Sequence, residues 1–268
     1  MWMKDLFKTN KPVIGMLHLL GMPTDPKYDP EGGMRKVIER ARADLKALQD
    51  GGIDAIIVCN EFSIPYVTNV RPVTIASMAR IIGELKSEIR VPLGVDTAID
   101  PYSVFDLAVA VDADFVRETF HGAYTGDYGI NNNQLGEVMR HRHEVGADHI
   151  RTLATLVPEG MKQVSEREIE DVARSFTFAG QPDALLVYGL TAGRGVDSSL
   201  IKRAKSVVDT PVFASNGVND RTIVDTLTIA DGCVVGTYFK YDGQFYNGVD
   251  VERVKKLMGL AKEYRGDE

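Results

Sequence analysis

Two short stretches near the carboxyl end, Val212–Gly217 (VFASNG) and Cys233–Thr237 (CVVGT), decide the fold of this chain. Each is a short apolar strand followed by glycine, and a helix-like stretch, Asp220–Ile229, lies between them. This is the pattern of the last two β/α units of a (β/α)8 barrel, whose loops after strands 7 and 8 commonly form a phosphate-binding cup. Because glycine lacks a Cβ, backbone N–H groups there can approach an anion closely. The two stretches therefore predict both a fold and a class of ligand.

The remainder of the chain repeats the same strand–helix unit. The eight predicted strands are Val13–His18, Ala55–Asn60, Pro92–Asp96, Phe115–Glu118, His149–Ala154, Ala184–Tyr188, Val212–Ala214 and Gly232–Val235. The predicted helices between and after them are Gly33–Gln49, Thr74–Lys86, Ser103–Val111, Asn133–Val145, Glu166–Ala179, Ser198–Val207, Asp220–Ile229 and Val251–Tyr264. Several strands are continuous apolar runs, as in parallel sheets covered by helices. We therefore predict an α/β fold, a single (β/α)8 TIM barrel with a parallel eight-stranded core that takes up residues 1–268 as one domain.

An open doubly wound sheet is the structural alternative. It would need a dinucleotide fingerprint near the first strand, and Gly15–His18 is not one. The first seven residues, 1–7, are predicted to cap the bottom of the barrel, with Trp2 or Phe7 as an apolar plug.

Composition excludes several classes of function. The net charge of −7 argues against broad affinity for nucleic acid, which needs clustered positive charge. No apolar run approaches the ~20 residues of a membrane span and no signal peptide is evident, so we expect a cytoplasmic protein without an integral membrane segment. Cys59 and Cys233 both fall in predicted strands, which favours buried, reduced thiols over a disulfide.

Polar residues gather where the predicted strands end, and in a parallel barrel these ends converge on one mouth. They are His18, Asn60, Glu61, Asp96, Asp100, Arg117, Glu118, His121 and Arg151. Charged groups in such places need water, partners or a ligand. So many of them together favour a functional mouth over isolated ion pairs.

Five of these residues are the predicted catalytic set: His18, Glu61, Asp96, Arg117 and Arg151. Glu61 and Asp96 are paired carboxylates able to move a proton beside a carbonyl, with His18 as the acid. An arginine would stabilise the developing oxyanion or clamp a carboxylate or phosphate. The competing interpretation is that the two carboxylates merely neutralise the two arginines.

A metal is the second possibility for the mouth. His18, Glu61, Asp96 and His121 could together ligate a divalent cation. No compact motif supports this, so the metal requirement stays unknown. We expect no organic cofactor, because proton transfer beside a carbonyl needs none.

The predicted phosphate-binding residues are Gly193, Gly195, Asn216, Gly217, Gly236 and Thr237. The stretch Gly189–Gly195 after strand 6 offers backbone donors, Arg194 and the start of a helix, although a plain turn is an equal alternative. Lys240 follows strand 8, and phosphate contact or surface charge is favoured over a Schiff base. Long connections at Leu20–Gly32, Thr119–Asn132 and Leu156–Ser165 favour a lid or substrate wall on the same face.

At these residues the chain resembles the BtpA/SgcQ family of the ribulose-phosphate-binding barrel superfamily, nearly from end to end. The stretches that carry the resemblance are Lys11–His18, Val91–Asp96, Ala113–Glu118, Gly189–Gly193 and, most specifically, Ala230–Gly243. Cys59–Tyr66 (CNEFSIPY) is similar to the SgcQ branch, whereas the BtpA branch tends to carry Glu-Asn in place of Cys59-Asn60. The turn at Ala214–Gly217 is less glycine-rich than in many members.

The resemblance implies a barrel among proteins associated with sugar-phosphate metabolism, and it names no reaction. BtpA relatives are associated with photosystem I biogenesis and SgcQ-like members with sugar uptake. Our leading expectation is an isomerase, epimerase or lyase that acts on a phosphorylated sugar or related metabolite. The alternative is a non-catalytic assembly factor or scaffold that retains a phosphate cup. A homo-oligomer is possible, and a nucleic-acid partner is not expected.

Overall fold

Eight parallel strands close into a barrel in the computed structural model, which describes residues 2–188 and 197–267. Their order around the barrel is β1-β11-β10-β9-β7-β4-β3-β2. The strands are β1 (Val13–His18), β2 (Ala55–Cys59), β3 (Leu93–Asp96), β4 (Phe115–Glu118), β7 (Arg151–Thr155), β9 (Ala184–Val187), β10 (Val212–Ala214) and β11 (Cys233–Val235). Closure is completed by β1, which pairs in parallel with β11 on one side and β2 on the other. The predicted TIM barrel is confirmed.

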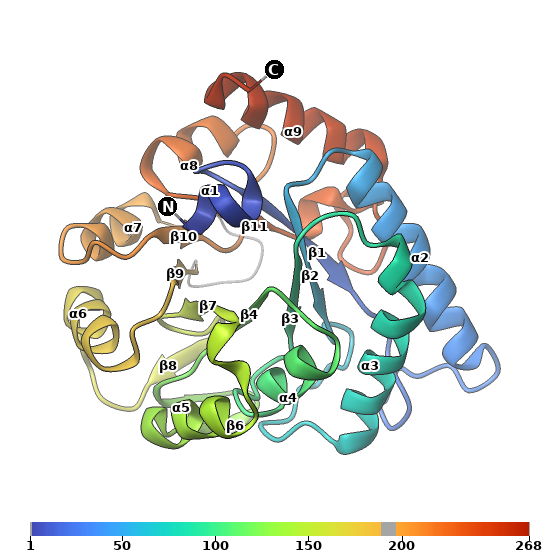
Figure 1. Cartoon of the computed structure of the whole chain (residues 1–268), viewed down its shortest axis with the longest axis horizontal. Coiled ribbons are helices and arrows are strands. Elements are labelled where there is room, and N and C mark those ends of the chain that lie inside the picture. The colour runs from blue at the N-terminus through green and yellow to red at the C-terminus, as the bar shows by residue number, and fades with distance from the viewer. Residues whose placement is uncertain (1, 189–196, 268) are drawn as a thin grey trace.

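Helices surround the barrel, one after almost every strand, as Figure 1 shows. They are α2 (Gly33–Asp50), α3 (Pro72–Leu85), α4 (Ser103–Ala110), α5 (Leu135–Glu144), α6 (Ile169–Gly180), α7 (Ser198–Lys205), α8 (Ile223–Ile229) and α9 (Val251–Arg265). The last helix begins at a capping residue, Asp250, whose side chain accepts a hydrogen bond from the backbone N–H of Glu252. Such a cap satisfies one of the amides that a helix start leaves without a partner.

Two hydrophobic cores follow from the alternation of side chains along each strand. One side of each strand packs against the helices, as Leu17 and Val58 do. The other side fills the inside of the barrel, where Met16, Ile57 and Phe213 lie. Gly94 belongs to the inside because a Cβ there would come within 2.3 Å of the Phe115 ring. The barrel interior is therefore solid, and ligands can enter only at its ends.

The amino-terminal helix α1 (Trp2–Phe7) lies across one end of the barrel (Figure 1). Phe7 is buried and packs edge-on against Phe115, with ring centroids 5.5 Å apart. Burial of a phenylalanine side chain contributes about 1.5–3 kcal/mol, which holds this helix in place. The predicted apolar plug is confirmed, and it closes the end where the strands begin.

A second sheet was not predicted. Strands β5 (Gly122–Gly126), β6 (Gly129–Asn133) and β8 (Met161–Gln163) form an antiparallel sheet in the order β6-β5-β8. The connections after β4 and β7, expected as open loops, thus pair with each other. They build a wall beside the mouth rather than two separate loops.

Both cysteines are free and buried, as predicted. Within the described residues, no helix is both long enough and apolar enough to cross a membrane.

Candidate functional site

A ring of mostly polar residues forms the floor of the mouth where the strands end. Residues two positions beyond the inward-facing core residues must also face inward, because the side-chain period of a strand is two. The ring therefore consists of His18, Cys59, Asp96, Arg117, Thr155, Tyr188, Ser215 and Gly236, one from each of the eight strands or the residue next to it. Three of the predicted catalytic residues, His18, Asp96 and Arg117, are members. Glu61, two residues beyond Cys59, lies above the ring.

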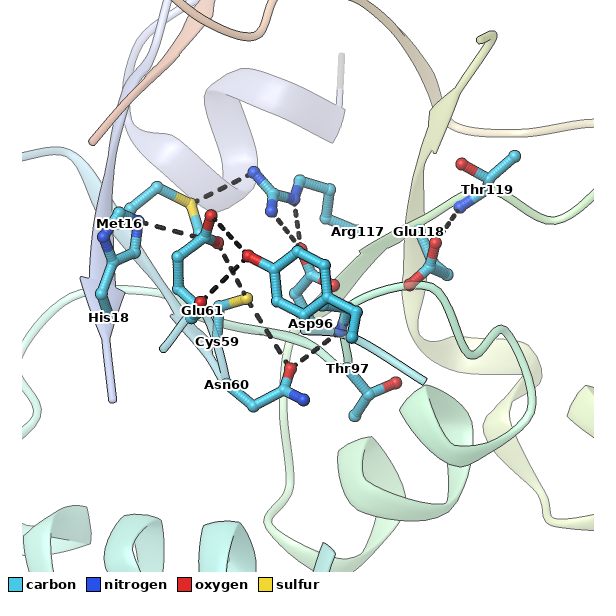
Figure 2. A network of polar contacts seen from close by, with 12 residues as sticks. Met16, His18, Cys59, Asn60, Glu61, Asp96, Thr97, Arg117, Glu118 and Thr119 are labelled. Atoms are coloured by element: carbon cyan, nitrogen blue, oxygen red, sulfur yellow. Dashed lines mark hydrogen bonds and ion pairs between the residues drawn. The ribbon is translucent and has the colours of Figure 1, made fainter. Parts of the chain in front are cut away.

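Asp96 and Arg117 form an ion pair on this floor (Figure 2). Arg117 Nε donates to Asp96 Oδ2 at 2.5 Å, and both side chains are nearly inaccessible to solvent. Burial raises the pKa of Asp96, and the positive charge of Arg117 opposes that shift. The competing interpretation, in which a carboxylate neutralises an arginine, therefore holds for Asp96.

One nitrogen of Arg117 has only a weak partner. Its Nη1 group lies 3.3 Å from the sulfur of Met16, which is a poor hydrogen-bond acceptor. An oxygen of a ligand would be a stronger acceptor than this thioether. Arg117 can thus keep its ion pair with Asp96 while Nη1 retains the capacity to donate to a stronger acceptor than Met16.

Glu61 is the carboxylate that faces the mouth, and its side chain is 22% exposed. Tyr66 donates a hydrogen bond to Oε1 at 3.0 Å, and the Cys59 thiol donates to Oε2 at 3.4 Å. Burial raises the pKa of the thiol, so Cys59 stays protonated and acts as a donor. These two contacts hold the carboxylate in one orientation above the ring.

His18 lies beside Glu61, with its Nε2 atom 3.9 Å from Glu61 Oε2 (Figure 2). This separation is too long for a hydrogen bond, so both groups remain able to bind a ligand atom. The rings of Phe62 and Phe245 lie on the imidazole, with centroids 5.7 and 5.6 Å away. Among the described residues, the Nδ1 atom of His18 has no hydrogen-bond partner.

His18 is neutral at neutral pH. Burial, followed by the positive charges of Lys240, Arg117 and Arg40, holds its pKa well below the ordinary value of 6.5. A neutral imidazole has one ring nitrogen with a proton and one without, so it can donate or accept. The side chain can therefore polarise a carbonyl or exchange a proton without carrying a charge into the site.

Gly236 leaves a gap in the ring next to His18. A Cβ at this position would lie 3.1 Å from Cε1 and 3.2 Å from Nε2 of the imidazole. Any larger residue would therefore cover the reactive edge of His18. The glycine gives a ligand access to that edge.

The predicted phosphate cup is only partly described. Gly217 has φ of +66°, a conformation that favours glycine, and Gly236 precedes a short 3-10 turn over Thr237–Phe239. The first amides of such a turn have no partner inside it. Asn216 donates to Glu159 Oε1 at 3.1 Å, and burial raises the pKa of that carboxyl. Gly193 and Gly195 lie outside the described residues.

Arg151 does not belong to the mouth, and its predicted placement there is wrong. It is the first residue of β7, pairs with Asp183 at 2.7 Å and lies over the ring of Trp2. These neighbours belong to the opposite end of the barrel. The strand begins two residues later than predicted, which moves Arg151 from its interior to its start.

Lys240 is fully buried, so the expectation of a surface charge is also wrong. Its ammonium lies 3.6 Å from the carboxylate of Asp44 on α2. Asp44 also accepts a hydrogen bond from the backbone N–H of Val249 at 2.8 Å. Together they hold the segment 240–249, which carries Phe245 to His18.

Three other strand-end residues have structural partners. Asp100 accepts hydrogen bonds from the backbone amides of Val70 and Ser103 near the start of α4. Glu118 accepts from Thr119 at 2.6 Å and points away from the Asp96 pair (Figure 2). His121 stacks on Phe176 of α6 at a centroid distance of 4.2 Å.

A metal site receives no support from this geometry. Within residues 2–188 and 197–267, no three His, Cys, Asp or Glu side chains are grouped as ligands of a metal ion would be. The suggested set is divided, because His121 packs under the second sheet whereas His18 and Glu61 face the mouth.

Sequence reasoning missed several site residues that come from loops. Tyr66 orients Glu61, Tyr128 packs on Tyr66 with centroids 5.1 Å apart, and Phe245 covers His18. Aromatic residues in loops carry no periodic signal that would place them. Tyr66 ends the stretch Cys59–Tyr66 that carries the family resemblance, which was a signal for that residue alone.

Known proteins resemble the chain over its whole length. It matches the BtpA family over residues 9–263. SgcQ, a protein of the sgc region of Escherichia coli (strain K12), is 50% identical over 265 residues, which cover 98% of this chain and 99% of SgcQ. The photosystem I biogenesis protein BtpA of Synechocystis sp. (strain PCC 6803) is 28% identical over 261 residues, 96% of this chain and 90% of BtpA.

Solved structures agree on the fold. The thiamine phosphate pyrophosphorylase of Pyrococcus furiosus superposes with a TM-score of 0.58 at 16% identity and covers 95% of this chain and 96% of its own. At that identity the likeness shows the barrel alone. From the family match and the identity to SgcQ, the chain belongs to the BtpA family.

Proposed function

We propose that the protein is an enzyme that moves a proton beside the carbonyl group of a phosphorylated small molecule, as an isomerase, epimerase or lyase does. The observation that supports this best is the pairing of Glu61 with His18. A carboxylate fixed by two hydrogen bonds faces a neutral imidazole across 3.9 Å, next to the gap at Gly236. This arrangement offers a base and a proton donor to one small ligand.

The proposed proton transfer uses three side chains. Glu61 removes the proton from the carbon next to the carbonyl, and the electron pair of that C–H bond moves onto the carbonyl oxygen. His18 Nε2 and Arg117 Nη1 donate hydrogen bonds to the oxygen as its negative charge develops. Delivery of a proton to the opposite face of the same carbon completes an epimerisation. Delivery to the former carbonyl carbon, with loss of the proton from the neighbouring hydroxyl and protonation of the former carbonyl oxygen, completes an isomerisation. In a lyase reaction the electron pair instead expels a leaving group from the next carbon.

The phosphate group would bind next to Gly217, Gly236 and Thr237. Positive φ at Gly217 and the start of the 3-10 turn bring backbone N–H groups to the edge of the mouth. The Asn216 amide would turn from Glu159 to the phosphate. Burial raises the pKa of Glu159, so this carboxyl would take up a proton more readily when a phosphate binds beside it.

A thermal-shift experiment tests the ligand class. Phosphorylated sugars, their unphosphorylated counterparts and inorganic phosphate are each added to the protein. At a hundredfold excess over Kd, binding stabilises the native state by about 2.7 kcal/mol. That corresponds to roughly 5 °C or more in Tm for a chain of this size. We expect a shift with phosphorylated compounds only.

Two glycine variants show whether the cup is responsible. Gly217→Trp fills the proposed cup, whereas Gly266→Trp places the same side chain at an exposed glycine with a similar φ of +69°. Both variants carry similar backbone strain. Loss of the ligand shift in the first variant alone supports the proposal. If no phosphorylated compound raises the Tm of the wild-type protein, the proposed ligand class is wrong.

A protein-assembly role is the second candidate, because a relative at 28% identity is named as a photosystem I biogenesis protein. In that case the barrel binds another protein and the mouth residues serve stability only. Indifference to every small phosphate, together with a co-purifying protein lost on substitution of surface residues, would favour this candidate.

A further inference from the structure

A second carboxyl group lies at the mouth and takes no part in the proton transfer described above. Glu159 is in the connection that follows β7, is half-buried and accepts a hydrogen bond from Asn216 at 3.1 Å. Burial raises the pKa of this carboxyl, the negative charge of Glu61 adds to the shift, and Arg117 opposes it. Glu159 is therefore close enough to Glu61 and Arg117 to interact with both of them.

The contact with Asn216 places this carboxyl over the end of β9. Glu159 follows β7 and Asn216 follows β10, and β9 lies between these two strands in the barrel. The residue after β9 is Tyr188, a member of the ring. Burial raises the pKa of Tyr188 to about 12, and the negative charge of Glu159 adds to that shift, as expected when the carboxyl lies above the phenol.

Strand β9 lies directly opposite β2, the strand that Glu61 follows (Figure 1). Three strands separate β9 from β2 in each direction, β10, β11 and β1 on one side and β7, β4 and β3 on the other. The two carboxyls therefore face each other across the mouth. A carbon atom bound between them would have Glu61 on one face and Glu159 on the other.

The surroundings of the two carboxyls suit opposite roles. Glu61 is held as an acceptor by the donors Tyr66 and Cys59. Glu159 is held by the amide of Asn216, which would turn to the phosphate when the ligand binds. An anion beside a carboxyl whose neutral form is already favoured by burial keeps the proton on it. One ligand would thus have a base on one side and an acid on the other.

We infer that Glu159 is a catalytic acid that gives its proton to the reacting carbon on the face opposite Glu61, which makes the reaction an epimerisation. Glu61 takes the proton from that carbon, and the electron pair of the C–H bond moves to the carbonyl oxygen. The pair then returns to the same carbon, which takes the proton of Glu159, and the carbonyl forms again. Glu61 is left protonated and Glu159 ionised, and proton exchange of both with water restores the starting state.

This inference rests on the proposed function and narrows its substrate class. The ligand would be a phosphorylated sugar with a hydrogen on a stereocentre beside its carbonyl group, and the product would be the epimer at that carbon. An isomerase can use the same base for both proton transfers, so it needs no acid on the opposite face.

Heavy water separates the two proton transfers. The probes are pentose and hexose phosphates, each as the ketose and the aldose, and NMR follows deuterium uptake and the appearance of the epimer. The wild-type protein should release an epimer that carries deuterium at the inverted carbon. Glu159→Gln should form this epimer at least about a hundredfold more slowly, because an amide cannot supply the proton. Its uptake of deuterium into the unconverted sugar should continue, because Glu61 still removes and returns a proton.

Two further variants serve as controls. Glu166→Gln removes a carboxyl from the same connection between β7 and α6, where Glu166 is 88% exposed and paired with Lys162, so both rates should stay unchanged. Glu159→Asp keeps a shorter acid and should retain part of the epimerisation, which distinguishes loss of the acid from loss of folding.

The outcomes separate this inference from the proposed function. Epimer formed at the wild-type rate by Glu159→Gln, or equal loss of exchange and epimerisation in both variants at this position, would overturn the inference. Deuterium uptake by the wild-type protein without any epimer would overturn it as well, while the proposed proton removal would stand. Absence of deuterium uptake in the wild-type protein would instead contradict the proposed function, and the inference would fail with it.

Discussion

Asp96 and Arg117 neutralise each other on the floor of the mouth, and this shapes what either residue can do. Arg117 occupies Asp96 Oδ2 and the Asp96 side chain is only 4% exposed, whereas Glu61 is 22% exposed at the mouth, so the proposed base is Glu61 rather than Asp96. The sequence indicated both carboxylates equally, because strand-end position alone does not say which one meets an arginine. Contacts across neighbouring strands, here β3 and β4, make that distinction.

Asp96→Asn should destabilise the protein by about 3–5 kcal/mol, because it leaves the buried charge of Arg117 without a partner. Urea unfolding measures this loss. Asp148→Asn is the control, since Asp148 pairs with His143 on the exposed surface and its loss should cost under about 1 kcal/mol. A similar small loss for Asp96→Asn would mean that the pair is not buried as described.

The neutral state of His18 depends on the rings that cover it. Removal of one ring by Phe245→Ala should admit water and raise the pKa of His18 toward its ordinary value of 6.5. A pH titration of the ring protons by NMR measures this, with exposed His143 as an internal reference. The charges that face His18 come from Glu61, Lys240, Arg117 and Arg40. An unchanged low pKa would show that these charges, and not burial by Phe245, set it.

At the scale of elements, most strands and helices of the barrel could be predicted from the sequence. Largely apolar runs of six and three residues predicted β1 and β10 with their observed bounds, because buried parallel strands are mostly apolar. The bounds of β4, which begins with Phe115-Val116 and ends in Arg117-Glu118, were also predicted as observed. The fifth barrel strand shows where this reasoning stops. Because Ile150 is apolar, the sequence predicts that the strand begins before it, at His149. In the structure Ala147–His149 form a 3-10 turn, and the strand begins at Arg151. That shift removed one predicted catalytic residue from the site.

The antiparallel sheet β6-β5-β8 was beyond prediction for a different reason. Its strands are rich in glycine and asparagine, which are depleted in strands, and β8 is only three residues long. β5 and β6 form a hairpin, and β8 joins them from about forty residues along the chain, a pairing that no local pattern records. The buried Tyr124, which donates to the carbonyl of Leu156 at 2.9 Å, anchors the sheet to the barrel.

His121 below this sheet should make the protein less stable in mild acid. Burial lowers its pKa from 6.5 to about 4 in the native state, so below pH 6.5 the unfolded chain binds the proton more tightly. The contribution of neutral His121 to the free energy of unfolding is therefore complete above pH 6.5, and it is lost as the pH falls toward 4. By linkage, this loss amounts to about 3 kcal/mol.

Comparison with a variant isolates this contribution. Urea unfolding of the wild-type protein and His121→Gln between pH 7 and pH 4 should show a steeper loss in the wild type. Glu118, whose pKa is raised well above normal by burial, acts in the opposite direction in both proteins and cancels in the difference. Parallel pH profiles would show that His121 is not buried in its neutral form.

At the scale of the whole molecule, the barrel has one open end. Helix α1 closes the end where the strands begin, so the polar ring at the other end is the place where a ligand can reach the interior. The family and the fold were evident from sequence motifs, whereas the loop aromatics that enclose His18 and orient Glu61 were not. Fold alone does not determine the reaction, so the chemistry rests on these side chains.

Exchange of carbon-bound hydrogen in heavy water tests the central claim most directly. Proton abstraction by Glu61 must let deuterium enter the carbon beside the carbonyl of a bound phosphorylated compound, whatever the overall reaction. NMR or mass spectrometry of the sugar phosphates that stabilise the protein measures this. We predict exchange with the wild-type protein and at least about a hundredfold slower exchange with Glu61→Gln. Absence of exchange in every stabilising compound, or equal exchange in both proteins, would contradict the account.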